Sequence, residues 1–269
     1  MRAHLVQLDI AWEDPAENFR RVDRLLSSRD IGEHDLVVLP ELFDTGFSFN
    51  TDRTADRDGA TASYLANLAD DLGCLVQGGR TVRACVGDSC ALARNHATVF
   101  GPGGRLVAEY AKVHPFSISG ESGSFQGGDE VITYAWKREA DELSVCPAVC
   151  YDLRFPELFR VGLLAGAEVF AIGANWPSPR VGHWRALSIA RAIENQAVVL
   201  SVNRVGSDPK VSYPGGSIAI DHVGEVLGEL GAEEGVLSVE VPGEALREWR
   251  EKFPVWKDIK LIGPAVGSG

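Results

Sequence analysis

Residues 143–160 read LSVCPAVCYDLRFPELFR, and this stretch decides the fold class. The apolar run of residues 143–149 predicts a buried β-strand, and residues 155–164 continue with the spacing of a helix. Cys150 therefore lies where a strand passes into a helix. In sheets of this kind ligands bind outside the carboxyl ends of the strands, so the stretch predicts both a βα unit and a candidate site.

The rest of the chain repeats the alternation of strands and helices. Strand character is found in residues 3–10, 36–39, 74–78, 97–100, 105–110, 168–173, 197–203, 217–221 and 236–241. Helical spacing covers residues 61–72, 183–195 and the segment that begins at Asp14-Pro15 and extends to Leu26. The last two strands are expected to be antiparallel. Strands alternating with helices predict an α/β domain in which helices cover the sheets.

The bulk composition favours one domain. The 269 residues are 45% hydrophobic and contain no proline-, serine- or charge-rich linker, so residues 1–269 are predicted to form a single domain. Residues 262–269 are expected to be a flexible tail. The glycine- and serine-rich residues 114–129 predict a long loop, of a length that is usually functional or mobile.

The charge and the cysteines bear on partners and location. A net charge of −12 argues against nucleic acid and against an anionic membrane. No apolar run approaches the roughly 20 residues of a membrane span, and no secretion signal is recognisable. The odd number of cysteines then predicts free thiols in the cytoplasm. Of the five, Cys74, Cys85 and Cys90 are expected to be inert and buried, Cys146 is expected in the core, and Cys150 is the candidate nucleophile.

Polar residues at strand ends are the candidates for chemistry: Glu41, Lys112, Cys150, Asn175 and Asn203. Near a helix N-terminus, Cys150 is expected to be favoured as a thiolate, although an inert buried cysteine is the commoner state. Glu41 beside an apolar strand is expected to have a raised pKa and could take a proton from a thiol. Lys112 could stabilise an oxyanion. Taken singly, Glu41 and Lys112 could equally be ordinary surface residues.

Three strings join these residues into one pattern. VVLPELFDTGF (37–47), YAKVHPFSISGE (110–121) and VCYDLRFPELFR (149–160) resemble, in that order, the glutamate, lysine and cysteine motifs of the nitrilase superfamily of carbon–nitrogen hydrolases. The resemblance continues through residues 174–208 and 250–258, where it is most similar to bacterial ω-amidases that act on 2-oxo acid amides. It implies a four-layer αββα sandwich, a homodimer or higher homo-oligomer, and neither a metal nor an organic cofactor.

The resemblance also implies roles for individual residues. Glu41 corresponds to the general base, Lys112 to the oxyanion stabiliser and Cys150 to the nucleophile. The backbone N–H of Tyr151 would complete the oxyanion hole, and Glu121 corresponds to an additional glutamate that positions Lys112 and the substrate. The sequence departs from the family pattern at Pro115, where leucine is usual; proline stiffens the segment before Glu121 and removes an N–H group.

An ω-amidase substrate carries a carboxylate at the end away from the amide, so a local cation is expected to bind it. Arginine grips carboxylates bidentately. The candidates are Arg180, which we favour, Arg154, which could instead pair with Asp152, and Arg204. The aromatic side chains of Phe116 and Trp176 are expected to form walls of the pocket.

Other mechanisms and functions remain open at this stage. His114 and His183 lie near the motifs, but nothing orders either against Cys150 as a Cys–His dyad requires, and both are expected to be structural. No spacing typical of a metal site occurs. Alternative functions are another nitrilase-superfamily activity (aliphatic amidase, N-carbamoyl hydrolase or nitrilase) or a non-catalytic thiol or interaction protein.

Overall fold

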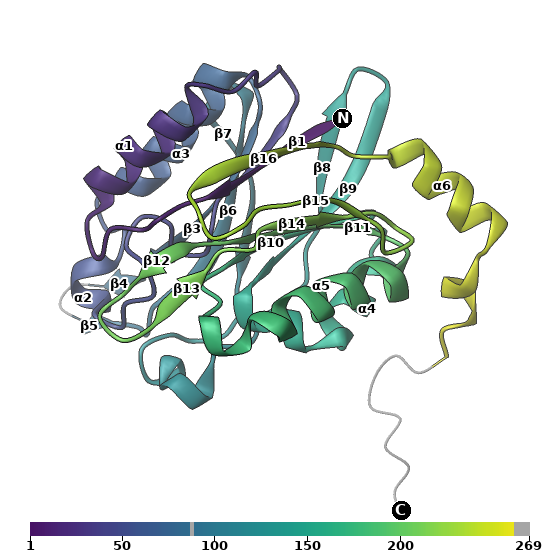
Figure 1. Cartoon of the computed structure of the whole chain (residues 1–269). Coiled ribbons are helices and arrows are strands. Elements are labelled where there is room, and N and C mark those ends of the chain that lie inside the picture. Colours follow the sequence, from purple (N-terminus) through teal and green to yellow (C-terminus); the bar gives the residue numbers. More distant parts are fainter. Residues whose placement is uncertain (87–88, 261–269) are drawn as a thin grey trace, which may run out of the picture.

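Two six-stranded sheets pack face to face in the computed structural model, which describes residues 1–86 and 89–260 (Figure 1). The first sheet has the spatial order β16 (Gly235–Glu240), β1 (Arg2–Gln7), β2 (Leu36–Val38), β3 (Leu75–Val82), β6 (Arg94–Gly101) and β7 (Arg105–Ala111). The second has the order β15 (Val226–Glu229), β14 (Ile218–Ile220), β11 (Val198–Asn203), β10 (Val169–Ala174), β9 (Asp141–Val149) and β8 (Tyr134–Arg138). The expected flexible tail, residues 262–269, lies outside the described residues.

Helices cover the outer face of each sheet, which makes four layers (Figure 1). Helices α1 (Pro15–Leu26) and α3 (Ala60–Leu72) pack on the first sheet. Helices α4 (Pro156–Leu164) and α5 (Val181–Asn195) pack on the second. The predicted αββα sandwich is confirmed.

Local sequence signals explain where these helices begin and end. The side chain of Asp14 accepts a hydrogen bond from the backbone N–H of Glu17 at 3.1 Å, and Pro15 occupies the first turn, as predicted. Helix α3 ends at Gly73, whose φ of 63° is a left-handed conformation that glycine adopts without strain. Both helix ends were therefore encoded locally.

The core between the sheets is apolar, and a group of hydrogen bonds around Gln77 crosses it. Inward-facing strand residues from both sheets form a single buried cluster around the fully buried Trp136. Within it, the Gln77 side-chain amide nitrogen donates to the backbone carbonyl of Ala171 at 3.0 Å. The Tyr134 hydroxyl donates to the side-chain oxygen of Gln77 at 3.1 Å. Because Gln77 belongs to the first sheet and its two partners to the second, these bonds fix the sheets relative to each other.

The strand pairing brings the candidate residues to one edge of the second sheet. Strands β9, β10 and β11 are parallel, with Val149 opposite Gly173 and Ala174 opposite Asn203. Their carboxyl ends therefore lie side by side, followed by Cys150 after β9 and Asn175 after β10. The predicted antiparallel pairings are also present: β14 with β11 and β16 with β1.

Several elements were not anticipated from sequence. They are α2 (Thr51–Thr54), β4 (Cys85–Val86), β5 (Ser89–Cys90), β8, β12 (Val205–Ser207), β13 (Ser212–Pro214), β15, α6 (Gly243–Lys252), η1 (Pro102–Gly104) and η6 (Val255–Asp258). Helix α6 is rich in charged residues and buries one large side chain, Leu246, among the described residues, so few apolar residues mark it in the sequence. Within the described ranges, no helix is both long and apolar enough to cross a membrane.

The cysteines depart from the prediction at one position. Cys74 and Cys146 are free and buried, as expected, and Cys150 is free and partly exposed. Cys85, however, is disulfide-bonded and exposed. The expectation that all five are free thiols is therefore wrong, because Cys85 lies on a surface strand rather than in the core. The side chain of Cys90 lies outside what the structure describes.

Candidate active site

Cys150 occupies the predicted elbow after β9. The strand ends at Val149, a short 3₁₀ turn η4 (Cys150–Arg154) follows, and α4 then begins at Pro156. Cys150 has a φ of 47°, a left-handed conformation that is costly for a residue with a Cβ atom. Strain of this kind concentrates at functional sites, where the surrounding structure enforces it.

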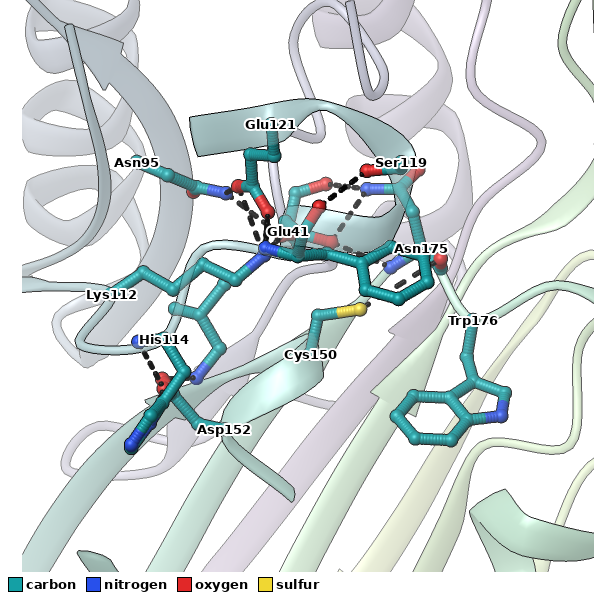
Figure 2. Close-up of polar contacts among 12 residues, drawn as sticks. Glu41, Asn95, Lys112, His114, Ser119, Glu121, Cys150, Asp152, Asn175 and Trp176 are labelled. Atoms are coloured by element: carbon teal, nitrogen blue, oxygen red, sulfur yellow. Dashed lines mark hydrogen bonds and ion pairs between the residues drawn. The ribbon is translucent and has the colours of Figure 1, made fainter. Parts of the chain in front are cut away.

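Asp152 holds this elbow to the segment that carries Lys112. One carboxylate oxygen accepts hydrogen bonds from the Val149 backbone N–H at 3.0 Å and from the Tyr110 hydroxyl at 2.8 Å. The other accepts the His114 backbone N–H at 3.0 Å and lies 2.9 Å from the His114 Nδ1 atom. Asp152 thus fixes the strand end before the nucleophile against both sides of Lys112 (Figure 2).

These contacts also decide the roles of two neighbouring residues. Both oxygens of Asp152 accept hydrogen bonds from other groups, and the guanidinium of Arg154 lies 4.8 Å from the centre of the Trp176 ring instead. The alternative pairing of Arg154 with Asp152 is therefore wrong. His114 faces Asp152, and His183 Nδ1 lies 3.3 Å from the Arg154 guanidinium, so these contacts fit the structural roles expected of both histidines.

Glu41 lies on a turn pressed between the two sheets. Two glycines make room for its backbone: a Cβ atom on Gly79 of β3 would overlap the Leu42 nitrogen, and one on Gly173 of β10 would lie 2.9 Å from the Glu41 nitrogen. Its side chain is then held by Asn175, whose backbone N–H donates to Oε2 at 3.0 Å. The turn therefore requires a glycine on each sheet.

Lys112 is the centre of a buried ionic group (Figure 2). Its Nζ atom lies 2.8 Å from Glu41 Oε1 and 2.9 Å from Glu121 Oε2. Asn95 of β6 adds a side-chain amide that donates to Glu41 Oε1 at 2.8 Å. Lys112, Glu41 and Glu121 are 2%, 1% and 0% exposed. The stiffening proline before Glu121 has thus not kept that carboxylate from Lys112.

The charges of this group set its protonation states. Burial by itself would raise the pKa of Glu41, but the charge and hydrogen bond of Lys112, with donors from Asn175 and Asn95, hold it below its ordinary value. The expected raised pKa of Glu41 is therefore wrong. Burial raises the pKa of Glu121 above its ordinary value. The charge of Lys112 opposes this shift, and the negative charge of Glu41 adds to it. The two carboxylates raise the pKa of Lys112 despite its burial, so the ammonium is charged.

The side chain of Cys150 is a neutral thiol. Burial, followed by the negative charge of Glu41, raises the pKa of Cys150 well above its ordinary value, and the charge of Lys112 opposes this shift. The expectation that the helix N-terminus favours a thiolate is therefore wrong, because burial, together with the charges of Glu41 and Glu121, outweighs it. The thiol lies 3.8 Å from the carbonyl oxygen of Asn175. Reaction at Cys150 would consequently require a base to remove the proton, and the lowered pKa of Glu41 keeps a carboxylate ionised nearby.

A pocket of about 190 Å³ opens onto Cys150 and Lys112. Its other lining residues are Phe47, Phe49, Phe116, Ser119, Tyr151, Arg154, Asn175, Trp176, Pro177, Arg180, Asp208, Lys210, Val211 and Tyr213. The predicted wall residues Phe116 and Trp176 are among them. Tyr151 also lines the pocket, with its ring centre 4.7 Å from that of Phe116. A wall that combines aromatic side chains with a few charged residues is typical of a site for a small polar molecule.

Two of the three arginines predicted to bind the substrate carboxylate line the pocket, and the third does not. Arg180 and Arg154 line the pocket, with the Arg180 guanidinium 5.3 Å from the centre of the Phe116 ring. Arg204 is wrong as a candidate: it is buried, and its guanidinium donates to the carbonyls of Val205 and Ile10, each at 3.0 Å. It supports the backbone beneath the pocket instead of facing a ligand.

Sequence reasoning missed Asn95 and Lys210. Asn95 lies in β6, two residues before the strand predicted at 97–100, and a polar residue next to a buried strand is the signal that could have revealed it. Lys210 lies between β12 and β13, and its Nζ atom is 5.5 Å from the centre of the Phe49 ring. No local motif marks it, because folding alone brings this turn to the pocket. Across the described part of the chain, no group of histidine, cysteine, aspartate and glutamate is arranged to hold a metal ion.

Comparison with known proteins agrees with this geometry. The family model for carbon–nitrogen hydrolase matches residues 2–251. The chain is 36% identical to the 2-oxoglutaramate amidase of Bacillus subtilis (strain 168), over 95% of this chain and 96% of that protein. It is 34% identical to the ω-amidase YafV of Escherichia coli (strain K12), with 96% of each chain covered. A solved carbon–nitrogen hydrolase superfamily protein from Xanthomonas campestris superposes with a TM-score of 0.85 at 33% identity, with 98% of each chain covered.

The chain belongs to the carbon–nitrogen hydrolase family. It is an enzyme that hydrolyses a carbon–nitrogen amide bond other than a peptide bond. The resemblance found in the three motif strings is thereby confirmed.

Proposed function

We propose that this enzyme is an ω-amidase that releases ammonia from short 2-oxo acid amides such as 2-oxoglutaramate and 2-oxosuccinamate. The observation that carries the proposal is the buried group of Lys112 and Glu41 next to the neutral thiol of Cys150, at the bottom of a pocket with cationic residues. The two relatives whose names specify 2-oxoglutaramate amidase and ω-amidase support the same substrate class.

The first half of the reaction forms a thioester. The ionised carboxylate of Glu41 takes the proton from the Cys150 thiol as the sulfur attacks the amide carbon. The carbonyl oxygen becomes an oxyanion, and the Lys112 ammonium with the Tyr151 backbone N–H stabilises it. When the tetrahedral species collapses, the carbon–nitrogen bond breaks. Glu41 returns the proton to the nitrogen, so ammonia leaves and the acyl group stays on sulfur.

The second half regenerates the enzyme. Glu41 is ionised again and takes a proton from a water molecule, whose oxygen attacks the thioester carbon. Lys112 and Tyr151 stabilise the second oxyanion. Collapse breaks the carbon–sulfur bond, the proton on Glu41 returns to the sulfur of Cys150, and the product carboxylic acid leaves. Glu121 takes no proton in this scheme; its carboxylate, at 2.9 Å, keeps Lys112 aimed at the oxyanion.

Recognition of the free carboxylate is assigned to the cations of the pocket. Arg180 is the principal candidate, and Arg154 and Lys210 contribute positive charge nearby. Their cationic groups lie against the rings of Trp176, Phe116 and Phe49, contacts that leave each charge available to an anion. Salt screens the net charge of −12 beyond about 8–10 Å, so this local charge decides whether an anion binds. Phe116 and Trp176 would enclose the carbon chain between the two ends.

Ammonia release from a panel of substrates tests the proposal. We expect 2-oxoglutaramate and 2-oxosuccinamate to be hydrolysed faster than glutamine, aliphatic amides, N-carbamoyl compounds and nitriles, and Cys150→Ala to abolish release. Equal or faster turnover of one of the other classes would favour another nitrilase-superfamily activity. Ammonia release that persists in Cys150→Ala would exclude Cys150 as the nucleophile. A folded protein that turns over nothing in the panel would refute the proposed substrate class.

We also propose a homodimer located in the cytoplasm. Helices α4 and α5 are in contact and carry exposed large apolar side chains, including Leu164 and Ile193, which supports a subunit contact there. Three of the described cysteines are free, which fits a reducing compartment, whereas the disulfide at Cys85 does not. Sedimentation velocity would test the dimer, and cell fractionation would test the location.

A further inference from the structure

We infer that Asn95 is a positioning residue of this active site, which holds Glu41 and Glu121 together around Lys112 and keeps Glu41 in its ionised, proton-accepting form. The inference rests on the proposed function for the role of Glu41 as the base. It goes beyond that function because it assigns a task to a neutral residue outside the triad.

Asn95 contacts all three charged residues of the buried group. Its backbone carbonyl accepts the N–H of Lys112 at 2.8 Å. Its side-chain Nδ2 atom donates to Glu41 Oε1 at 2.8 Å and lies 3.3 Å from Glu121 Oε1, within hydrogen-bonding distance (Figure 2). The residue is 2% exposed, so water does not compete for these bonds. One strand position therefore fixes the lysine backbone and both of its carboxylate partners.

The chemistry of the amide suits this position. Two carboxylates share one ammonium, so the buried group would carry a net charge of −1 with both carboxylates ionised, and the two anions repel each other. The amide nitrogen has two N–H groups and can donate one to each carboxylate without adding charge. An aspartate at this position would bring a third negative charge, and an apolar residue would leave the oxygens without these donors. Asparagine is thus matched to a pair of anions.

Asn95 lies closer to the carboxylate of Glu41 than to that of Glu121. Its shorter bond is made to Glu41, and the side chain is one of the donors that lower the pKa of this carboxylate. Glu121, at the longer distance, has a raised pKa. A donor that stabilises an ionised carboxylate more than its protonated form keeps it ionised to lower pH. Loss of Asn95 should therefore make Glu41 hold its proton at pH values where the native enzyme is active.

The experiment compares Asn95→Ala and Asn95→Asp with Asn195→Ala as a matched control. Asn195 is buried like Asn95, donates a side-chain hydrogen bond to the carbonyl of Arg191 at 3.0 Å, and has an unpartnered side-chain oxygen as Asn95 does, but it lies at the end of α5 away from the site. Turnover of 2-oxoglutaramate is measured against pH. The rate of Cys150 alkylation by iodoacetamide is measured over the same pH range, because it reports on the base without requiring turnover.

For Asn95→Ala we expect kcat to fall about tenfold to a hundredfold, the effect of one hydrogen bond to a charged group, with KM within about twofold of the native value. We expect the acidic limb of both pH profiles to move upward by about one pH unit. In Asn95→Asp the limb should move further, because the added carboxylate repels Glu41. Asn195→Ala should keep the native kcat and the native limb.

Two results would overturn the inference. The first is an acidic limb of the pH profiles of Asn95→Ala that coincides with the native limb. The second, which applies if Asn95→Ala does not fold, is an acidic limb of Asn95→Asp that coincides with the native limb. Failure of the proposed function is recognised separately: Cys150→Ala would then release ammonia like the native enzyme, or the native enzyme would not act on 2-oxoglutaramate, while the alkylation profiles still report on Asn95.

Discussion

Replacing Lys112 by methionine keeps the length of the side chain and removes its charge, so it isolates the ammonium. In the native protein the ammonium lies 2.8 Å from Glu41 and 2.9 Å from Glu121, and both carboxylates are fully buried. The variant leaves them as two buried anions without a counter-ion. It also removes a donor to the proposed oxyanion, which is typically worth about 10²–10³ in rate.

The magnitude of the stability loss follows from this burial. Removing one partner of a buried ion pair costs about 3–5 kcal/mol, because the remaining charge stays desolvated. Typical domains have a free energy of unfolding of about 5–15 kcal/mol, so the variant should remain folded at 25 °C. We therefore expect a folded protein whose kcat is at most about one hundredth of the native value.

The loss should depend on pH with a definite sign. Without Lys112, burial raises the pKa of Glu41 and Glu121 above their values in the unfolded chain. The folded variant then binds protons more tightly than the unfolded chain, so its free energy of unfolding falls as the pH rises from about 5 to 8. Each carboxyl can contribute up to about 1.4 kcal/mol per pH unit between its unfolded and folded pKa. In the native protein the lowered pKa of Glu41 acts in the opposite direction.

Urea unfolding at pH 5 and pH 8 measures this effect, alongside ammonia release. Lys137→Met is a suitable control, since it breaks a surface ion pair with Glu142 at 2.8 Å and should cost less than about 1 kcal/mol at either pH. The double variant Lys112→Met/Glu121→Gln should recover part of the stability at pH 8, because only one buried anion remains. Equal losses for Lys112→Met at pH 5 and pH 8 would refute the reasoning.

Two further predictions concern Asp44 and Arg180. Burial raises the pKa of Asp44 to about 7, so the free energy of unfolding of the native protein should fall as the pH rises from about 4 to 7. Urea unfolding should show Asp44→Asn gaining up to about 4 kcal/mol relative to the native protein over that pH range. Parallel stability curves for the two proteins would contradict this. Arg180→Met should raise KM for 2-oxoglutaramate about tenfold to a hundredfold, with KM for butyramide unchanged. Arg185→Met, which breaks an exposed pair with Glu229, serves as its control, and an equal rise in both KM values would rule out carboxylate binding by Arg180.

The central units of the fold could be read from sequence because their signals are local. The apolar run before Cys150, the N-cap at Asp14 and the C-terminal glycine at Gly73 each specify an element through neighbouring residues. The helix α6 and the pocket turn that carries Lys210 gave no such signal. Their positions depend on contacts with distant segments, which single-sequence patterns do not report.

The residues of the candidate site could also be predicted from sequence only in part. The motif strings identified Glu41, Lys112, Cys150 and Glu121, but they did not reveal the protonation states of these residues. The pKa of Glu41 was expected to be raised because a strand end is apolar, whereas it is lowered because Lys112 and two asparagines converge on it. Likewise Arg204 was a reasonable cation by residue type, yet folding buries it among backbone carbonyls.

The sequence by itself determined the class of the central elements, their order and the candidates for the reacting side chains, because hydrophobic periodicity, caps and motif residues are properties of contiguous segments. Only the tertiary structure decided which of these side chains meet, which are charged and which cations face the pocket. Segments as far apart as residues 41, 95 and 150 come together at one edge of two sheets. Burial there changes the energy of every charge, and that energy depends on all neighbours at once.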